Sequence, residues 1–500
     1  MKEISFLGKY LKDAHLFYKE HCHTTHTILY ESAEIIDKSG VQSLIGVSAA
    51  LKVYCNDLKV TLQPLNNNGR ALVKLTAELL NREYETGNLS IQYARSEKNL
   101  SQDELLKKEN PLSVMRALLQ VIKHCTNIFI GGIIAFDFIN NFEDLGSLPS
   151  GLNPCADYEF YVFDLCVRVN HQLQTTSIDA YAFCASEYEP LALKTLLLRD
   201  KINDFQGTEE LRIKPVNLKL NPDIADDRFK EIVGALKEHI KSGDAFQVVP
   251  SRTFSAPCHD PLKTYAYLKK LNPSPYMYYI KDDNFTLFGA SPEFALRFEA
   301  KSRTISISPI AGTRARGLNP DGSINQELDS RIELELRTDK KEVAEHLMLV
   351  DLARNDLARI SKPGTRYVDN LLHVDKYQAV MHLVSDVHAI LRDDLDALHA
   401  YCACMNMGTL SGAPKIKAHE LIYRYEGKKR GSYGGVVAIL SADGSFDSAI
   451  AIRSAYVKDK TAYVQAGCGV VFDSDEDAEC QETVNKARSV LNAIALAEEA

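Results

Sequence analysis

Short apolar segments separated by polar turns fill much of the second half of this chain and constrain its fold more than any other feature. Apolar runs of this length bounded by turn residues predict consecutive antiparallel strands. The segments cover residues 277–280, 286–290, 304–308, 435–440, 446–457 and 462–466. A buried strand is also expected at 128–136, which is too short and too quickly followed by Asp137 to span a bilayer.

Two long helical patterns interrupt these strands. Residues 327–360 are expected to be helical with a break or bend at Thr338 and Asp339, and a terminal helix is expected from about Asp477. Its acidic first turn matches the positive end of a helix dipole. Antiparallel strands interleaved with helices predict an α+β fold.

A length of 500 residues exceeds what one hydrophobic core usually serves. The polar stretch 204–224, which carries Gly207, Pro215 and Pro222, is the best candidate for a boundary. We therefore expect an N-terminal domain over 1–205 and a second domain over 225–500. The chemically suggestive residues gather in the second.

Composition excludes several classes of protein. A net charge of −9 spread along the chain disfavours nucleic-acid binding, and the first thirteen residues lack the apolar core of a signal peptide. Eleven scattered cysteines without a zinc-binding spacing indicate reduced thiols in the cytoplasm. His21, His23 and His26 form either a polar turn before a strand or, less simply, a metal site.

Two Glu-x-x-Glu pairs lie on the predicted helices. Glu342 and Glu345 form one pair, and Glu479 and Glu482 form the other. A spacing of three residues places both carboxylates on one helix face. Four carboxylates without a thiol or imidazole pattern suit Mg²⁺, while two solvated acidic faces are the alternative.

A cationic group follows near the end of the chain. Arg453 stands in an apolar segment, where its guanidinium needs either a substrate carboxylate or a structural ion pair. Gly467-Cys468-Gly469 ends a predicted strand and either presents backbone amides to an anion or forms an ordinary turn. Lys486, four residues after Glu482, either pairs with it or holds a carboxylate.

His382 lies in the apolar segment 379–384 and is either a core histidine or a catalytic one. No GxxxxGK[ST], GxGxxG or GxSxG motif occurs in the chain. Nucleotide hydrolysis, dinucleotide redox chemistry and the usual serine hydrolases are thereby disfavoured.

Taken in order, eight segments resemble the chorismate-utilising enzyme family over nearly the whole chain. They are GDAFQVVPSR (243–252), NPSPYMYY (272–279), GASPEF (289–294), PIAGTRARG (309–317), EVAEHLMLVDLARND (342–356), SGAPKIKAHELI (411–422), GSYGGVV (431–437) and AGCGVVFDSDEDAECQETVNKA (466–487). The resemblance implies a large antiparallel-sheet sandwich covered by helices, with an N-terminal regulatory part. It also implies that Glu345 and Glu482 hold Mg²⁺, with Glu342 and Glu479 as outer or alternate ligands.

Two positions select among the reactions of the family. Members that add water to chorismate carry a lysine where this chain has Gln247, and another branch has a lysine where this chain has Ala311. Neither Gln247 nor Ala311 supplies an amine or a general base. The resemblance therefore implies that ammonia attacks C2 of chorismate and that pyruvate is then lost.

The remaining roles are carried over position by position. Lys486 is a further candidate for holding a carboxylate of chorismate. Arg453, Tyr433 and the amides of Gly467, Cys468 and Gly469 would hold the enolpyruvyl carboxylate, and Gly312 and Thr313 would contact the ring. Glu293 would protonate the departing hydroxyl, and His382 would assist the elimination. Since the chain has no GxCxG glutaminase motif, ammonia from glutamine implies a separate amidotransferase subunit.

ESAEI (31–35) resembles a tryptophan-binding segment of feedback-regulated members. Ser32 would contact tryptophan together with Pro275, Tyr276 and Met277, while Gln42 replaces a lysine of relatives. The chain itself contains no tryptophan. Two other hypotheses remain: an aminodeoxychorismate synthase component that uses ammonia directly, and a non-catalytic tryptophan-sensing subunit.

Overall fold

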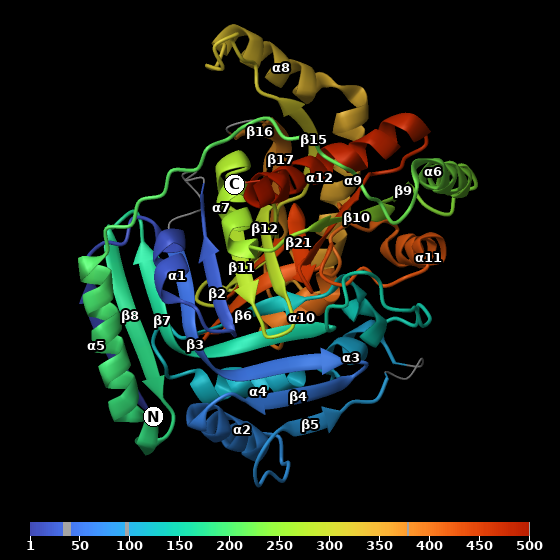
Figure 1. Ribbon diagram of the computed structural model, residues 1–500. Coiled ribbons are helices and arrows are strands. Elements are labelled where there is room, and N and C mark those ends of the chain that lie inside the picture. Colours follow the sequence, from blue (N-terminus) through green and yellow to red (C-terminus); the bar gives the residue numbers. More distant parts are fainter. Residues whose placement is uncertain (34–41, 96–99, 378–379, 500) are drawn as a thin grey trace.

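A computed structural model of the chain describes residues 1–33, 42–95, 100–377 and 380–499. Antiparallel strands form the centre of the molecule, and helices cover its outside (Figure 1). The α8 helix projects at the top of Figure 1, away from the N-terminal strands at the left and bottom. The predicted α+β class with a large antiparallel sheet is confirmed.

The N-terminal part of the chain supplies eight strands and five α-helices among the described residues. The strands are β1 (Lys2–Gly8), β2 (Thr27–Glu31), β3 (Gln42–Asn56), β4 (Lys59–Pro64), β5 (Leu89–Gln92), β6 (Phe129–Ile134), β7 (Tyr158–Asn170) and β8 (Thr175–Ala182). The helices are α1 (Ala14–His21), α2 (Asn67–Leu79), α3 (Gln102–Lys107), α4 (Ser113–Ile122) and α5 (Tyr188–Asp204), with short 3-10 turns η1 (Phe136–Asn141) and η2 (Ala185–Glu187).

The C-terminal part alternates strands and helices. Its first elements are α6 (Asp226–Lys241), β9 (Gln247–Val248), β10 (Ser251–Pro257), α7 (Pro261–Leu271), β11 (Tyr276–Lys281), β12 (Thr286–Ser291), β13 (Phe294–Glu299), β14 (Thr304–Ile307), β15 (Ile310–Ala315), α8 (Gln326–Thr338) and α9 (Lys340–Ala358). The others are β16 (Tyr367–Lys376), β17 (Val380–Ile390), α10 (Ala397–Cys404), β18 (Gly412–Ala413), α11 (Lys415–Glu426), β19 (Val436–Ser441), β20 (Phe446–Ile450), β21 (Ser454–Lys458), β22 (Thr461–Gly467) and α12 (Glu476–Glu499).

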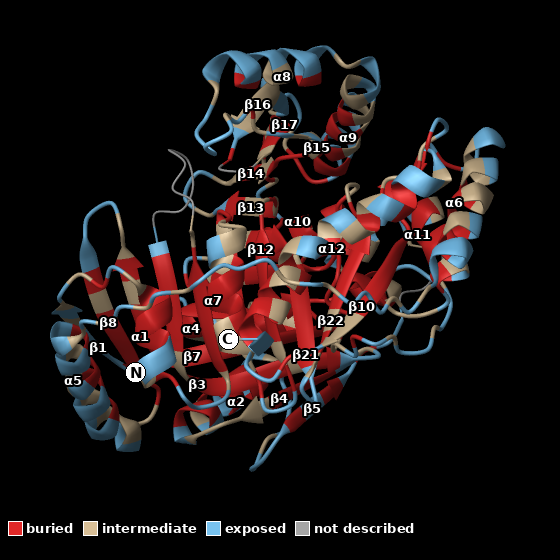
Figure 2. Cartoon of the chain, turned by 45° about the horizontal axis from the view of Figure 1, so that its top comes forward, coloured by how far each residue is buried: buried red, intermediate tan, exposed pale blue. Residues whose placement is uncertain are grey.

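Two arms of sheet extend from the β3–β7 pair. One arm runs β3–β2–β11–β12–β21–β22–β10, and the other runs β7–β6–β19–β20–β13–β14–β17. Side chains of both arms, such as Ile280 and Ile450, meet in one buried core. The strands are buried along most of their length, while the outer helices keep exposed faces (Figure 2). Removal of this apolar surface from water drives the layering.

The polar stretch expected as a boundary contains no helix or strand from Phe205 to Asn221. The two sides of it nevertheless share backbone hydrogen bonds, because β2 pairs with β11 and β6 pairs with β19. The division into domains over 1–205 and 225–500 therefore stays a prediction about the chain.

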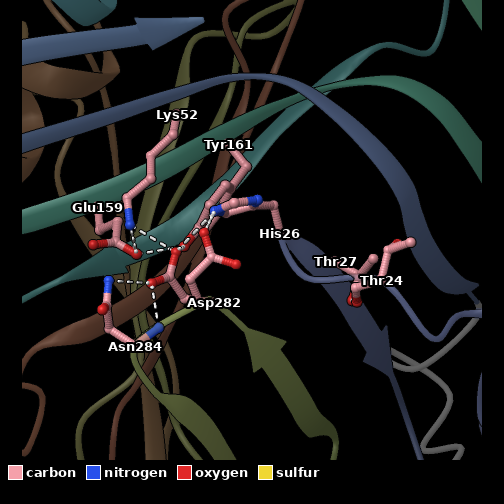
Figure 3. Close-up of polar contacts among 9 residues, drawn as sticks. Thr24, His26, Thr27, Lys52, Glu159, Tyr161, Asp282 and Asn284 are labelled. Carbon is pink, nitrogen blue, oxygen red and sulfur yellow. Dashed lines mark hydrogen bonds and ion pairs between the residues drawn. The ribbon is translucent and has the colours of Figure 1, made fainter. Parts of the chain in front are cut away.

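A buried cluster of charges joins the same two parts. Lys52 of β3 lies 2.6 Å from Asp282, in the turn after β11, and 3.1 Å from Glu159 of β7 (Figure 3). The Tyr161 hydroxyl donates to Asp282 at 2.7 Å. His26, just before β2, lies 3.4 Å from Asp282, so the expected polar turn before a strand is confirmed at this histidine.

One strand prediction is wrong. Residues 446–457 are expected as one strand, whereas the structure has two strands, β20 and β21, with Arg453 between them at a left-handed φ of 48°. The β20 strand pairs with β19 and β13, while β21 pairs with β12 and β22. The chain passes from one arm to the other at this point, and an apolar run conceals that crossing.

The other expected elements appear. The helical stretch 327–360 is divided into α8 and α9 at Asp339, whose side chain accepts from the amides of Lys341 and Glu342 and so caps α9. The buried strand at 128–136 is β6. All eleven cysteines are free thiols. In the described part of the chain, no helix is long and apolar enough to cross a membrane.

Candidate active site

Acidic side chains of α9 and α12 gather at one place. The pKa of Glu345 is raised to about 7, mainly by burial, with Lys341 acting in the opposite direction and the neighbouring charges of Glu342, Glu479 and Glu482 adding to the rise. Burial also raises the pKa of Glu479. The two predicted pairs, far apart in sequence, therefore interact electrostatically as expected of a shared site.

Two of these carboxylates have an oxygen without a hydrogen-bond partner. They are Oε1 of Glu345 and Oε2 of Glu479, both buried. Glu342 pairs with Arg314 at 2.8 Å, and Glu482 pairs with Lys486 at 2.6 Å. Glu345 has only a longer ion pair, with Lys341 at 3.8 Å, and the other oxygen of Glu479 accepts from Ser474 at 2.7 Å. Buried anionic oxygens without a donor are what a hard cation would satisfy.

Within the described residues, no three acidic, histidine or cysteine side chains already stand close enough together to hold a metal ion. The donor chemistry fits Mg²⁺, since all four candidates are carboxylates and two keep an unsatisfied oxygen. Ligation by Glu482 in addition requires its side chain to leave Lys486.

His382 lies on β17, directly opposite Thr313 of β15. The Thr313 hydroxyl and Nδ1 of His382 are 3.0 Å apart. Burial and, to a smaller extent, the positive charge of Arg453 lower the pKa of His382 to about 4. The imidazole is therefore neutral near pH 7 and able to accept a proton.

The neighbouring Gly312 has a φ of 73°, and a Cβ there would come within 2.9 Å of Oε2 of Glu342. A side chain at this position would be strained and would press against the acidic group. Gly312 thus lets β15 pass close to α9.

Glu293 is buried in the turn between β12 and β13 and accepts a hydrogen bond from Thr409 at 3.1 Å. Burial raises the pKa of Glu293 to about 8, although Thr409 and Lys486 act in the opposite direction. The carboxyl is therefore largely protonated at neutral pH, which is the form that a general acid needs.

Arg453 and Lys486 form the cationic side of the site. Arg453 donates to the backbone carbonyl of Lys486 at 3.1 Å, and the Lys486 ammonium donates to the carbonyl of Gly467 at 3.1 Å. Burial lowers the pKa of Arg453, and no acidic side chain in the described part of the chain forms an ion pair with it. The structural ion pair weighed from the sequence is therefore not present there.

The end of β22 brings further predicted residues together. A Cβ on Gly467 would come 3.0 Å from the Tyr433 hydroxyl, and one on Gly469 would come 2.7 Å from Nε2 of Gln247. Oε1 of Gln247 is buried without a hydrogen-bond partner. These glycines permit a close approach that any side chain would block.

One expected anion donor is occupied. The amide of Cys468 donates to the carbonyl of Pro250 at 3.1 Å, so this amide is not available to a substrate carboxylate. The physical reason is the pairing of β22 with β10, whose first residue, Ser251, stands opposite Gly467.

All five residues expected at a feedback site line one cavity of about 390 Å³, and these are Ser32, Gln42, Pro275, Tyr276 and Met277. Oε1 of Gln42 accepts from Arg168 at 3.0 Å. Glu34 and Ile35 of the 31–35 motif lie outside the described residues. That tryptophan binds in this cavity stays a prediction.

The same cavity has charged groups on its wall. Arg297 pairs with Asp447 at 3.2 Å and donates to the Tyr276 hydroxyl, and Glu31 pairs with Lys269 at 2.9 Å. Both signs of charge stand beside apolar surface, which suits a zwitterionic ligand with a large apolar side chain.

Sequence reasoning missed three residues that hold this site together. Thr409 bonds Glu293, and Arg430 and Glu426 form a fully buried ion pair behind Tyr433. The position of Arg430 immediately before the GSYGGVV segment was the available indication, but its partners come from distant segments.

The chain matches the chorismate binding enzyme family over residues 77–492. It is 46% identical to "Anthranilate synthase component 1" of Haemophilus influenzae over 483 residues, which cover 94% of this chain and 92% of that protein. It is also 46% identical to "Anthranilate synthase component 1" of Escherichia coli strain K12, over 95% of this chain and 93% of that one.

Solved structures agree with the fold. Anthranilate synthase component I from Streptococcus pneumoniae TIGR4 superposes with a TM-score of 0.71 and 29% identity, covering 92% of this chain and 93% of that one. MenF, the menaquinone-specific isochorismate synthase from Escherichia coli, has a TM-score of 0.67 at 17% identity, covering 99% and 94%. The second likeness bears on the fold alone.

Proposed function

Since the chain belongs to the chorismate binding enzyme family and groups with its anthranilate synthase component I proteins, we propose that it converts chorismate and ammonia to anthranilate and pyruvate, the first step from chorismate toward tryptophan. It is an enzyme that acts on chorismate. The observation that carries the proposal is the meeting of carboxylates on α9 and α12, two of which keep a buried oxygen without a hydrogen-bond donor, with Arg453, Lys486 and a neutral His382.

The carboxylates are the proposed metal site. Glu345 and Glu482 would hold Mg²⁺, with Glu342 and Glu479 as outer or alternate ligands. Bound there, Mg²⁺ would orient the ring carboxylate of chorismate and withdraw charge from the ring. The unpaired oxygens of Glu345 and Glu479 support this assignment.

The cationic side would bind the other end of the substrate. Arg453 lacks an acidic partner among the described side chains, so a carboxylate of chorismate would complete its surroundings. Tyr433 and the glycines 467 and 469 would line the same edge, with Lys486 beside them. Gly312 and Thr313 would face the ring.

Amination follows from the two selector positions. Gln247 and Ala311 supply neither a base for water nor a competing amine, so ammonia would add at C2. The hydroxyl at C4 would leave with a proton from Glu293, whose carboxyl is protonated at neutral pH because burial raises its pKa to about 8.

The elimination step would use a base, whereas the amination step uses the acid Glu293. His382 is neutral because burial lowers its pKa to about 4, and its Nδ1 lies 3.0 Å from the Thr313 hydroxyl, which orients the ring. A neutral imidazole can accept the proton that leaves C2 as the enolpyruvyl group departs as pyruvate. The ring thereby becomes aromatic.

Regulation and supply complete the proposal. L-Tryptophan would inhibit by binding in the cavity lined by Ser32, Gln42 and the Pro275–Met277 segment. Ammonia would come from glutamine through a separate glutamine amidotransferase subunit. Eleven free thiols suit a reducing compartment, and we place the enzyme in the cytoplasm.

The deciding experiment incubates the purified chain with chorismate, Mg²⁺ and an ammonium salt. Fluorescent anthranilate and an equal amount of pyruvate are expected. An aminodeoxychorismate synthase would instead release a stable amino intermediate without pyruvate. A chain that binds tryptophan but leaves chorismate unchanged would be a non-catalytic sensor, and either result would contradict the proposal.

A further inference from the structure

The loop that carries Tyr433 is held by a buried ion pair that the mechanism above does not use. Arg430 is fully buried, and its guanidinium bonds both carboxylate oxygens of Glu426, with Nε at 2.9 Å from Oε2. It also donates to the carbonyls of Leu410 at 2.8 Å and Val249 at 2.6 Å. Every guanidinium nitrogen is therefore engaged inside the protein, and none is left for a substrate.

Glu426 extends the same network to the start of β10. Its Oε1 accepts from the Ser251 amide at 2.8 Å and from the Ser251 hydroxyl at 2.9 Å. Ser251 in turn accepts from the Gln465 side chain of β22 at 2.8 Å and stands opposite Gly467 in the sheet. The ion pair is thus bonded to the strand end that faces the substrate edge.

The segment Val249–Ser251 then determines where Gly467 lies. The Pro250 carbonyl accepts from the Cys468 amide, and it would lie 2.5 Å from a Cβ on Gly467. The Tyr433 hydroxyl also lies against this face of Gly467, 3.0 Å from where a Cβ would stand, and the ring centre of Tyr433 lies 5.7 Å from the guanidinium carbon of Arg430. The two groups that crowd Gly467, the Pro250 carbonyl and the Tyr433 hydroxyl, thus belong to segments that the ion pair contacts.

We propose that Arg430 and Glu426 are positioning residues for the reaction, which set the places of Tyr433 and Gly467 at the substrate-binding edge. The inference rests on the proposed function, because it requires that edge to hold the enolpyruvyl carboxylate. A buried ion pair contributes little net stability compared with apolar packing, so its contribution here is geometric.

The test compares two buried carboxylates. Glu426→Gln removes one charge next to the site, and Asp282→Asn removes one from the Lys52 cluster (Figure 3), which shares no hydrogen bond with the Arg430–Glu426 network among the described residues. With chorismate, Mg²⁺ and ammonium, Glu426→Gln is expected to raise KM for chorismate about tenfold with a smaller effect on kcat. Asp282→Asn should lower the unfolding temperature to a similar extent while KM stays within about twofold of the parent.

Two further variants test the positioning role independently if Glu426→Gln fails to fold. Ser251→Ala removes only the hydrogen bonds that the Ser251 hydroxyl makes with Glu426 and Gln465. Arg430→Lys retains the positive charge but not the several N–H donors of the guanidinium. Both should raise KM. Ser251→Ala should do so at a nearly unchanged unfolding temperature, whereas Arg430→Lys should also lower that temperature, because the buried carbonyls of Leu410 and Val249 lose donors. Equal KM in the parent, Ser251→Ala and Arg430→Lys would overturn the positioning role.

Tyr433→Phe separates this inference from the proposed function. If Tyr433→Phe raises KM and the double variant with Ser251→Ala is less than additive, the two residues act on one contact, as we expect. If Tyr433→Phe raises KM while the network variants do not, positioning is refuted and the proposed function stands. If Tyr433→Phe leaves KM unchanged, the proposed substrate edge itself is wrong, and this inference falls with it.

Discussion

At His382 a buried imidazole, neutral at pH 7, lies 3.0 Å from the Thr313 hydroxyl. Because the proposed mechanism uses this imidazole only in the elimination, His382→Met should slow aromatisation more than amination, and chromatography should show an amino intermediate accumulating. His388→Met is the matched control, because His388 lies on the same strand and also bonds a hydroxyl, that of Ser306. Equal loss of both steps would make His382 a binding or structural group.

Glu293 couples activity to stability at a single side chain. The folded pKa of about 8 exceeds the usual 4.5, so the folded state holds a proton that the unfolded state has lost between these values. Below pH 4.5 the carboxyl is protonated in both the folded and the unfolded state and does not change the free energy of unfolding. As the pH rises from 4.5 toward 8, the carboxyl lowers that free energy by up to about 1.4 kcal/mol per pH unit. Glu293→Gln should thus lose activity yet gain relative stability over this window.

Thermal unfolding of the parent and of Glu293→Gln, measured from about pH 5 to about pH 9, brackets the titration of the Glu293 carboxyl. The stability difference should grow with pH and then level off above about 8. A difference independent of pH would mean that the Glu293 carboxyl is ionised in the folded protein throughout.

At the scale of elements, α9 and α12 matter because each brings one carboxylate pair to the same place. Glu345→Gln or Glu482→Gln removes a charge from the proposed Mg²⁺ site, and the rate should fall about 100-fold or more. Calorimetric titration with Mg²⁺ should show weakened binding in the same variants. Glu327→Gln on the exposed face of α8 is the control, and if Glu345→Gln resembles it, these glutamates are ordinary surface acids.

The strands β2, β3 and β11 define the proposed effector cavity, since Ser32 follows β2, Gln42 begins β3, and Pro275–Met277 leads into β11. Ser32→Phe should fill this cavity and abolish inhibition by L-tryptophan, with turnover in ammonia nearly unchanged. Ser302→Phe in an exposed turn should remain sensitive. Equal tryptophan sensitivity in the parent and Ser32→Phe would place the effector elsewhere.

At the scale of the whole molecule, effector cavity and active site belong to one continuous system of paired strands. Because binding free energies are linked reciprocally, tryptophan and chorismate should weaken each other's binding by the same factor.

The ammonia supply is also a property of the whole chain. The isolated chain should make anthranilate from ammonium salts at raised pH but not from glutamine, and robust glutamine-dependent turnover by the pure chain would refute the two-subunit proposal.

The sequence by itself determined what depends on neighbouring residues. Strand and helix periodicity gave the α+β class, and the break between α8 and α9 follows from Asp339, which caps the second helix with its own side chain. The resemblance of eight segments supplied the candidate residues for the reaction, and five residues expected around an effector do line one cavity.

Only the tertiary structure decided which distant groups meet. The apolar run 446–457 concealed the crossing at Arg453, because both strands are buried and periodicity carries no sign of a change of partner. The engaged Cys468 amide and the Arg430–Glu426 pair depend on contacts with β10 and on the carbonyls of Leu410 and Val249, far away in sequence. Burial keeps the Glu293 carboxyl protonated and holds the pKa of His382 well below its usual value, and burial exists only once the chain has folded.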